Sequence, residues 1–283
     1  MKILVTGAGG QLGFDVTKEC QRRGFSVWGA TRQDFSLTDT AKMEEQVRRF
    51  SPEAVIHCAA YTAVDKAEDE KETAYAVNAM ATRNLAVICR DLGAKFIYIS
   101  TDYVFPGKGE KFYEPEDAKE PLNAYGASKL AGEEAVQEML TNYFIVRISW
   151  VFGRNGKNFI RTMLNLSETH NEIKVVADQI GSPTYTKDLA PLLLDMAASD
   201  KYGVYHATNE GVCSWATLAA EVFRQAGRRT KVIEVPTAAY PTKATRPLNS
   251  RLSKACLDEA GFQRLPDWRD AVRRYLSELR EAR

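Results

Sequence analysis

The sequence predicts an α/β protein with a doubly wound parallel sheet and a smaller, interleaved C-terminal lobe. Two observations predict this fold class. Short apolar runs alternate with stretches of helical spacing through the first half of the chain, which is typical of parallel strands covered by helices on both faces. After about residue 202 the alternation gives way to shorter elements. A chain of 283 residues can bury one large core or two modest ones.

The strands of the predicted sheet are short and rich in β-branched and aromatic residues. We expect strands at Lys2–Thr6, Ser26–Ala30, Ala54–Cys58, Lys95–Ser100, Tyr143–Ser149 and Ile173–Ala177. Between the first five, apolar spacing predicts helices at Asp15–Arg23, Thr38–Phe50 and Glu68–Leu92. Gly24 ends the first helix, and Thr38 or Asp39 caps the second. The smaller lobe is expected to contain a helix near Ser214–Ala226, a strand at Lys231–Val235, a proline-rich stretch and a charged terminal helix.

The charge balance and the cysteines exclude several classes of protein. With 38 basic and 37 acidic residues, nothing favours nucleic acid or an anionic membrane as a partner, so we expect a small-molecule substrate. The sequence shows no secretory signal and no apolar run of the roughly 20 residues that span a bilayer, which predicts a cytoplasmic protein. The five cysteines are scattered and odd in number, so we interpret them as reduced thiols. The three histidines share no spacing typical of a metal site, and no metal centre is predicted from them.

A glycine-rich turn lies directly after the first strand and before the first helix. Gly7, Gly10 and Gly13 form a Gly-x-x-Gly-x-x-Gly pattern. Such glycines permit a tight turn, close approach to a pyrophosphate and close helix packing, while the helix N-terminus offers free N–H groups to the anion. The position of the pattern favours a Rossmann-type dinucleotide site over a purely structural turn. We therefore expect an NAD(P)-binding domain at residues 1–150 with about 171–200, and a substrate-binding lobe at about 151–170 with 201–283.

The end of the second strand bears on the choice of cofactor. A dinucleotide fold usually places a carboxylate there for the adenosine ribose, but this chain has Arg32 and no acid before Asp34. An arginine can bind a 2′-phosphate, which favours NADPH over NADH, although Arg32 could equally be a solvated loop residue or stack on the adenine. NADH therefore stays plausible. Residues 59–62, after the third strand, would let the cofactor pass over the sheet edge, or they form a simple bend.

Three residues of the fourth and fifth strand–helix units predict proton-transfer chemistry. Thr101 ends the fourth strand, at the carboxyl edge where open α/β sheets bind ligands. Tyr125 and Lys129 lie one helical turn apart on one face. A lysine ammonium near a tyrosine hydroxyl lowers the pKa of the tyrosine toward a value useful for proton transfer, and it can also hold the nicotinamide ribose. The pair alone could belong to a surface helix, but its place after the glycine turn and Thr101 favours catalysis.

The order of glycine loop, Thr101 and Tyr125-x-x-x-Lys129 resembles that of the extended short-chain dehydrogenase/reductases, over the whole chain. Within them, longer strings resemble the dTDP-4-dehydrorhamnose reductase family. These strings are AAYTAVDKAE at 59–68, STDYVFPG at 100–107, PLNAYGASKLAGE at 121–133 and RPLNS at 246–250.

The resemblance implies that NAD(P)H reduces the C4 ketone of dTDP-4-dehydro-L-rhamnose, the last step of dTDP-L-rhamnose synthesis. It implies that Tyr125 protonates the forming alkoxide, that Lys129 tunes it, and that Thr101 hydrogen-bonds the carbonyl or the tyrosine. Along the cofactor it implies contacts from Gly10, Gln11, Leu12, Asp34, Phe35, Ala60, Tyr61 and Thr62. Toward the sugar or its nucleotide it implies contacts from Asp102, Tyr103 and Trp150. Because Thr31-Arg32 replaces an acid that some members carry, the choice of cofactor stays open.

Further expectations each have a plainer alternative. Trp150 could pack on a sugar face or belong to the core. Arg246 could bind a diphosphate or form a surface ion pair. Members of the family can form homodimers through helices and use Mg²⁺ at that contact. Here Asp15 and Glu278 would be the ligands, or they are simply solvated carboxylates.

Two rival functions stay open at this point. One is a related sugar-nucleotide enzyme, such as a 4-epimerase that retains its NAD or a reductase that makes a different deoxysugar. The other is a non-catalytic regulatory subunit with this fold. Such a subunit would be expected to lack Tyr125 or Lys129, and both are present.

Overall fold

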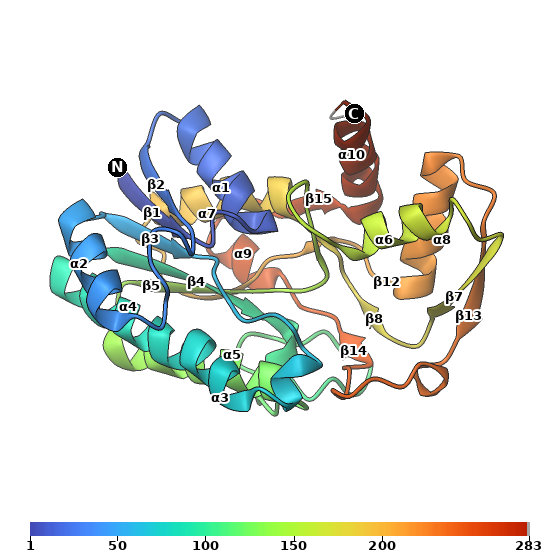
Figure 1. Ribbon diagram of the computed structural model, residues 1–283, viewed down its shortest axis with the longest axis horizontal. Coiled ribbons are helices and arrows are strands. Elements are labelled where there is room, and N and C mark those ends of the chain that lie inside the picture. The colour runs from blue at the N-terminus through green and yellow to red at the C-terminus, as the bar shows by residue number, and fades with distance from the viewer. Residues whose placement is uncertain (282–283) are drawn as a thin grey trace.

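In the computed structural model, which describes residues 1–281, six strands form the central sheet of a larger lobe (Figure 1). Every neighbouring pair in the sheet is parallel. The strand order reverses between β1 and β3, which is the switch point where open α/β sheets bind ligands. The predicted doubly wound parallel sheet is confirmed. Its order is β2 (Ser26–Ala30), β1 (Lys2–Thr6), β3 (Ala54–His57), β4 (Lys95–Thr101), β5 (Tyr143–Ile148) and β10 (Gly203–His206).

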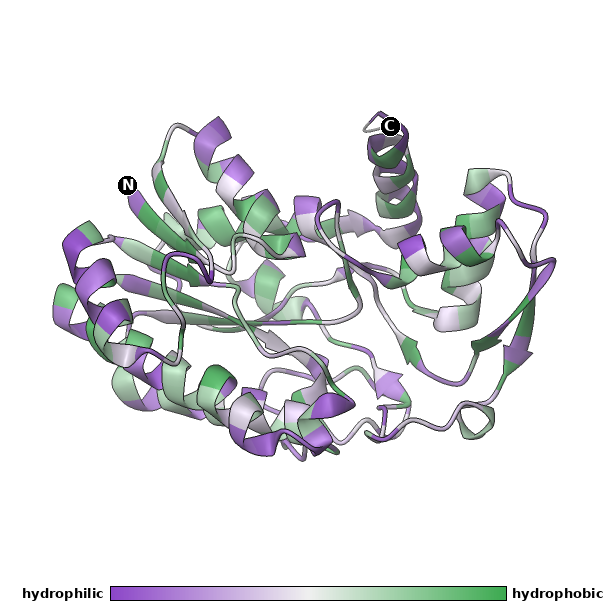
Figure 2. Cartoon of the chain, in the orientation of Figure 1, coloured by the Kyte–Doolittle hydropathy of each residue, from purple (hydrophilic) through white to green (hydrophobic). Residues whose placement is uncertain are grey.

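Helices cover both faces of this sheet (Figure 1). Alternate residues of β1 enter two separate cores. Ile3 and Val5 pack with the helices of one face, whereas Leu4 packs with those of the other. Because both faces are buried, the strands are continuous apolar runs, and Figure 2 shows them largely green among helices with purple outer surfaces. One face carries α1 (Gln11–Arg22) and α7 (Thr186–Ala197), and the other carries α2 (Thr40–Phe50), α4 (Ala81–Leu92) and α5 (Ala124–Met139).

The predicted helices of this lobe are present, with differences in their limits. α1 begins at Gln11, before the predicted start, because Gly10 is already its N-cap. The cap of α2 is Asp39, whose side chain accepts a hydrogen bond of 3.1 Å from the backbone N–H of Lys42. The predicted long helix before β4 is interrupted by a π-helical turn, a feature frequent at functional sites. Its pieces before α4 are η1 (Lys66–Glu68), α3 (Lys71–Tyr75) and the π-helical η2 (Ala76–Met80).

Short sheets and three helices form the smaller lobe. β7 (Glu172–Val176) pairs in parallel with β13 (Lys231–Val235). α6 (Phe159–Leu166), α8 (Trp215–Ala226) and α10 (Trp268–Glu281) supply most of its apolar core. The other pairs are β6 (Val151–Phe152) with β9 (Thr184–Tyr185), β8 (Ile180–Gly181) with β12 (Cys213–Ser214) and β14 (Asn249–Ser250), and β11 (Asn209–Glu210) with β15 (Leu265–Asp267). The remaining short helices are η3 (Asp102–Val104), η4 (Thr237–Ala239) and α9 (Ala255–Glu259). Within residues 1–281, no helix is both long and apolar enough to cross a membrane.

Strand pairing bears on the division between the lobes. The sequence groups residues 171–200 with the cofactor domain and 201–283 with the smaller lobe. However, among residues 1–281 β7 pairs only with β13 of the smaller lobe, whereas β10 extends the central sheet beside β5. Hydrogen-bonding partners decide where a strand belongs, and composition does not report them. We therefore propose a division in which β7 belongs to the smaller lobe, and α7 and β10 belong to the larger one.

Candidate active site

A cleft of about 1070 Å³ runs along the carboxyl edge of the central sheet and reaches the smaller lobe at Trp215. It brings together most of the site residues predicted from the sequence. Gly13, Asp34 and Arg246 are the predicted residues that do not line it. The predicted residues that do are Gly7, Gly10, Gln11, Leu12, Arg32, Phe35, Ala60, Tyr61, Thr62, Thr101, Asp102, Tyr103, Tyr125, Lys129 and Trp150.

The glycine loop has the geometry that a pyrophosphate site requires. Gly7 has φ +68°, and a Cβ there would meet the backbone of Ala59 at 2.8 Å. A Cβ on Gly13 would collide with the backbone of Gly7, so this glycine serves helix packing rather than ligand contact. Gly10 caps α1 without a side-chain hydrogen bond. The first turn of α1 therefore keeps N–H groups free for an anion, and these residues fit a dinucleotide.

The adenosine end of the cleft exposes one arginine. Arg32 is exposed and makes no hydrogen bond or ion pair with any other residue of the 1–281 span. Asp34 is turned away, because its Oδ2 accepts hydrogen bonds from Thr31 N at 2.8 Å and Thr31 Oγ1 at 2.9 Å. The backbone N–H of Thr31 holds the pKa of Asp34 below its usual value. Asp34 thus shapes the loop and leaves Arg32 as the charged side chain toward the cleft.

Asn78 of the π-helical turn joins the loop at Tyr61 to α5, and no role was predicted for it from the sequence. Its Oδ1 accepts a hydrogen bond of 2.8 Å from Tyr61 N, and its Nδ2 donates to Tyr61 O at 3.1 Å. The same Nδ2 donates to Ser128 Oγ at 2.9 Å. Ser128 precedes Lys129 on α5, so the loop and the helix share one buried side chain.

Close packing positions α5 against β4. The side chain of Asn123 caps α5 by accepting a hydrogen bond of 2.9 Å from Gly126 N. A Cβ on Gly126 would collide with the carbonyl oxygen of Tyr103, and one on Gly132 would collide with the hydroxyl of Tyr98. Only glycine lets the helix approach this closely, and the approach sets Tyr125 beside the end of β4.

Tyr125 and Thr101 meet at the carboxyl edge. The Thr101 side chain and the Tyr125 hydroxyl line the same cleft and lie close enough for Thr101 to lower the pKa of the tyrosine. The ring of Tyr103 packs edge-on against that of Tyr125, with 5.5 Å between the ring centres. Burial raises the pKa of Tyr125 above its usual value, and the Thr101 contact only partly opposes this. The tyrosine is therefore protonated at neutral pH, which suits a proton donor.

The sequence predicts that Lys129 lowers the pKa of Tyr125, and this prediction is wrong for the ligand-free protein. The ammonium donates a hydrogen bond of 2.7 Å to Ile99 O and lies 3.9 Å from the centre of the Tyr98 ring. Burial lowers the pKa of Lys129 to about 7, and the charge of Glu133 opposes this shift. Burial is the main cause of the shift at Tyr125, and the pKa of the tyrosine rises rather than falls.

Asp102 carries an unsatisfied buried oxygen at the substrate end. Its Oδ1 accepts a hydrogen bond of 3.0 Å from Thr101 Oγ1, whereas Oδ2 is buried without a hydrogen-bond partner among the described residues. Burial raises the pKa of this carboxyl to about 6, and the Ser250 side chain, which lies near the carboxyl without a hydrogen bond to Oδ2, partly opposes the shift. A buried acceptor without a partner fits a ligand hydroxyl.

Two indoles form the far wall of the cleft. Trp150 has φ +50°, one of two non-glycine residues in the left-handed region among residues 1–281. Its ring stacks on that of Trp215 at 3.8 Å and 17°. Trp215 was missed from the sequence, where it is one apolar residue of a helix. Its Nε1 donates to Gln179 Oε1 at 3.1 Å, and Phe159 packs behind it at 4.7 Å. Residues with a strained backbone conformation, such as Trp150, cluster at ligand sites.

Arg246 forms an ion pair, the plainer of its two expected roles, and lies behind the cleft. Its Nη2 contacts Asp65 Oδ2 at 2.5 Å, and its Nη1 donates to the Tyr103 hydroxyl at 3.2 Å. It therefore reaches the cleft only through Tyr103. The same Asp65 accepts a hydrogen bond of 3.1 Å from Ala244 N, so the two residues join the loop before β14 to the larger lobe.

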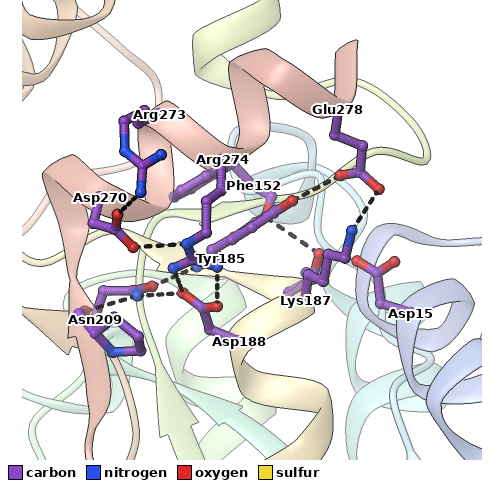
Figure 3. A network of polar contacts seen from close by, with 12 residues as sticks. Asp15, Phe152, Tyr185, Lys187, Asp188, Asn209, Asp270, Arg273, Arg274 and Glu278 are labelled. Carbon is purple, nitrogen blue, oxygen red and sulfur yellow. Dashed lines mark hydrogen bonds and ion pairs between the residues drawn. The ribbon is translucent and has the colours of Figure 1, made fainter. Parts of the chain in front are cut away.

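The expected Mg²⁺ ligands are engaged in other contacts (Figure 3). Asp15 is buried rather than exposed, and its carboxylate accepts a hydrogen bond from the Thr186 hydroxyl. Glu278 accepts a hydrogen bond of 2.7 Å from the Tyr185 hydroxyl and pairs with Lys187 at 3.5 Å. Over residues 1–281, no group of three or more His, Cys, Asp or Glu side chains is arranged to hold a metal ion. The Mg²⁺ expectation finds no support.

A parallel sheet with a glycine loop at its switch point, and a tyrosine, lysine and threonine at its carboxyl edge, defines a dinucleotide-dependent reductase of the short-chain type. The chain belongs to the family described as RmlD substrate binding domain, whose model matches residues 1–281. The resemblance noted in the sequence is thereby confirmed.

Individual relatives are similar over nearly their full length. The chain is 41% identical to the spore coat polysaccharide biosynthesis protein SpsK of Bacillus subtilis (strain 168), over 99% of both chains. It is 39% identical to the dTDP-4-dehydrorhamnose reductase of Escherichia coli (strain K12), over 99% of this chain and 98% of that one. The crystal structure of dTDP-4-dehydrorhamnose reductase from Bacillus anthracis in complex with NADP has a TM-score of 0.95 and 40% identity, covering 98% of this chain and 99% of that chain.

Proposed function

We propose that this chain reduces the C4 ketone of dTDP-4-dehydro-L-rhamnose to give dTDP-L-rhamnose, with NADPH as the hydride donor. One observation carries the proposal: Thr101, Tyr125 and Lys129 line the same cleft as the glycine loop. A carbonyl that accepts hydride develops negative charge on oxygen, so a protonated hydroxyl backed by a cation is the group the reaction needs. The names of the relatives supply the substrate.

The cofactor assignment rests on the free N–H groups and on Arg32. When bound, the reduced nicotinamide supplies the hydride. The first turn of α1 at Gln11 and Leu12 would hold the pyrophosphate, and residues 60–62 would pass beneath the nicotinamide half. Arg32 has no protein partner within the described residues and no neighbouring acid facing the cleft, which favours a 2′-phosphate and hence NADPH.

The proton comes from Tyr125. Its raised pKa keeps the hydroxyl protonated until the much more basic alkoxide forms beside it. Thr101 would hydrogen-bond the carbonyl oxygen and steer it toward the tyrosine. Lys129 contributes a positive charge that stabilises the tyrosinate left after transfer, provided that the ammonium stays protonated.

The sugar and nucleotide would extend toward the smaller lobe. Asp102 offers its unsatisfied Oδ2 to a sugar hydroxyl, and Tyr103 lies beside it. Trp150 would contact the sugar or its nucleotide. Arg246 would act through Tyr103 in this arrangement, unless the diphosphate displaces it from Asp65.

The rival functions differ in cofactor balance. The test is to offer dTDP-4-dehydro-L-rhamnose and NADPH to the purified chain and to follow NADPH absorbance and the product. A reductase consumes one NADPH for each product molecule, whereas an epimerase that retains NAD shows no net consumption and a regulatory subunit shows no turnover. The cytoplasmic location and the homodimer expected from the sequence stay predictions, and sedimentation analysis would decide the oligomeric state.

A further inference from the structure

A buried polar network lies directly behind the catalytic lysine. Glu133 is 2% exposed and Arg147 is 1% exposed. Arg147 binds Glu133 through two hydrogen bonds, from Nη2 to Oε2 at 2.7 Å and from Nε to Oε1 at 2.9 Å. Ser100 of β4 also donates to Glu133 Oε1, at 2.5 Å. One carboxylate on α5 therefore binds both β4 and β5.

Glu133 follows Lys129 by one helical turn, and Ser100 immediately precedes Thr101. The hydrogen bond between Ser100 and Glu133 thus joins the residue next to Thr101 to the helix that carries Tyr125 and Lys129. The groups in direct contact with the Lys129 ammonium are neutral: the carbonyl of Ile99 and the ring of Tyr98. A buried ammonium is costly unless a counter-charge lies near it.

The titratable groups packed around the ammonium come from four elements. The carboxylate among them is Glu133, and it favours the charged form of Lys129. His57 is buried with its pKa lowered to about 3 and stays neutral, and burial raises the pKa of the Cys58 thiol, which stays neutral too. His57 is the last residue of β3 and Cys58 follows it; Tyr98 lies in β4 and Glu133 in α5, and Arg147 of β5 pairs with Glu133.

We propose that Glu133 is a positioning residue of the active site, whose buried carboxylate is the counter-charge one helical turn from Lys129 and, through Ser100, holds α5 in register with the end of β4. The catalytic consequence of this inference rests on the proposed function. The effect of the Glu133 charge, in contrast, can be measured through cofactor binding without substrate.

The first experiment measures NADPH affinity against pH by cofactor fluorescence, without substrate, for the wild type, Glu133→Gln and Glu134→Gln. Glu134 is the matched control, because it is the next residue and is exposed. NADPH affinity is expected to fall as the pH rises and Lys129 loses its proton. Loss of the Glu133 charge is expected to move this fall to lower pH by about one unit, which lowers the affinity tenfold at a given pH above the fall. Glu134→Gln is expected to match the wild type. A folded Glu133→Gln protein with the wild-type pH dependence would overturn the proposal.

Glu133→Gln leaves Arg147 buried without its partner, which is destabilising and could prevent folding. The second experiment tests the proposal in that case. Glu133→Asp keeps the charge and is expected to retain the wild-type pH dependence of NADPH binding even if its thermal midpoint falls. Ser100→Ala keeps the ion pair and is expected to lower kcat about fivefold or more, with NADPH affinity unchanged. A wild-type kcat in Ser100→Ala would overturn the register role. Absence of turnover in the wild type would instead contradict the proposed function, and the NADPH titrations would still decide the charge role.

Discussion

The Nζ atom of Lys129 donates a hydrogen bond of 2.7 Å to the carbonyl oxygen of Ile99, two residues before Thr101 in β4. The bond holds a cation inside the protein, with 2% of the lysine exposed. Burial lowers the pKa of Lys129 to about 7 from its ordinary value of 10.5. The folded protein therefore tolerates this charge at a cost to its stability.

Lys129→Met is expected to stabilise the ligand-free protein at neutral pH while removing activity. Because the folded pKa is depressed, the unfolded chain binds more protons between the two pKa values, so wild-type stability rises with pH from about 7 to 10.5. The variant should be more stable by roughly 4 kcal/mol at pH 7, with the difference shrinking toward pH 10. Urea unfolding at several pH values measures this. A variant less stable than wild type at pH 7 would contradict it.

Arg32→Ala is expected to raise the KM for NADPH and leave that for NADH nearly unchanged. A charged hydrogen bond to phosphate contributes about 1.5–3 kcal/mol, which corresponds to roughly 10- to 100-fold in KM. Initial rates with each cofactor measure the effect, and Arg49→Ala on the exposed side of α2 serves as the control. Equal losses with both cofactors would argue that Arg32 stacks on the adenine instead.

Trp215→Ala is expected to weaken binding of the nucleotide sugar. The substitution removes the ring that stacks on Trp150 at 3.8 Å and frees Trp150 to leave its strained conformation. An aromatic pair contributes about 0.5–1.5 kcal/mol, so the KM for the sugar nucleotide should rise roughly fivefold while the KM for NADPH stays constant. Steady-state kinetics with either substrate varied measures both. An unchanged KM for the sugar nucleotide would show that the indole pair is structural.

Gly132→Ala is expected to destabilise the protein and to lower activity. The added Cβ would collide with the Tyr98 hydroxyl and the Asn78 carbonyl, which forces α5 away from β4. Such overpacking typically costs about 1–3 kcal/mol. Gly9→Ala is the matched control for stability, because no atom lies within 4 Å of a Cβ there and φ is not positive. Chemical denaturation compares the two variants, and equal midpoints would contradict the packing argument.

Local patterns predict those parts of the molecule that depend on neighbouring residues. The glycine loop, Thr101 and the spacing of Tyr125 and Lys129 follow from strand and helix periodicity, and the structure brings them into one cleft. Burial cannot be inferred in the same way. Asp15 was expected as a possible exposed metal ligand, but α7 covers it and Thr186 binds it.

Contacts between distant segments account for the rest of what the sequence does not predict. Trp215 reaches the cleft because the start of α8 lies against the segment after β5, and no local spacing indicates this. The pairing of Arg246 with Asp65 joins residues 181 positions apart. The pKa of Tyr125 depends on how completely the fold removes water from it, so the predicted direction of that shift was wrong.

The most direct test of the central claim compares wild type and Tyr125→Phe for NADPH consumption with dTDP-4-dehydro-L-rhamnose. Phenylalanine keeps the ring and removes only the proton donor, so NADPH affinity should stay within about twofold while kcat falls by roughly 10²- to 10⁴-fold. The wild type should consume one NADPH for each dTDP-L-rhamnose formed. No cofactor consumption by the wild type, or a Tyr125→Phe rate equal to that of the wild type, would contradict the assignment.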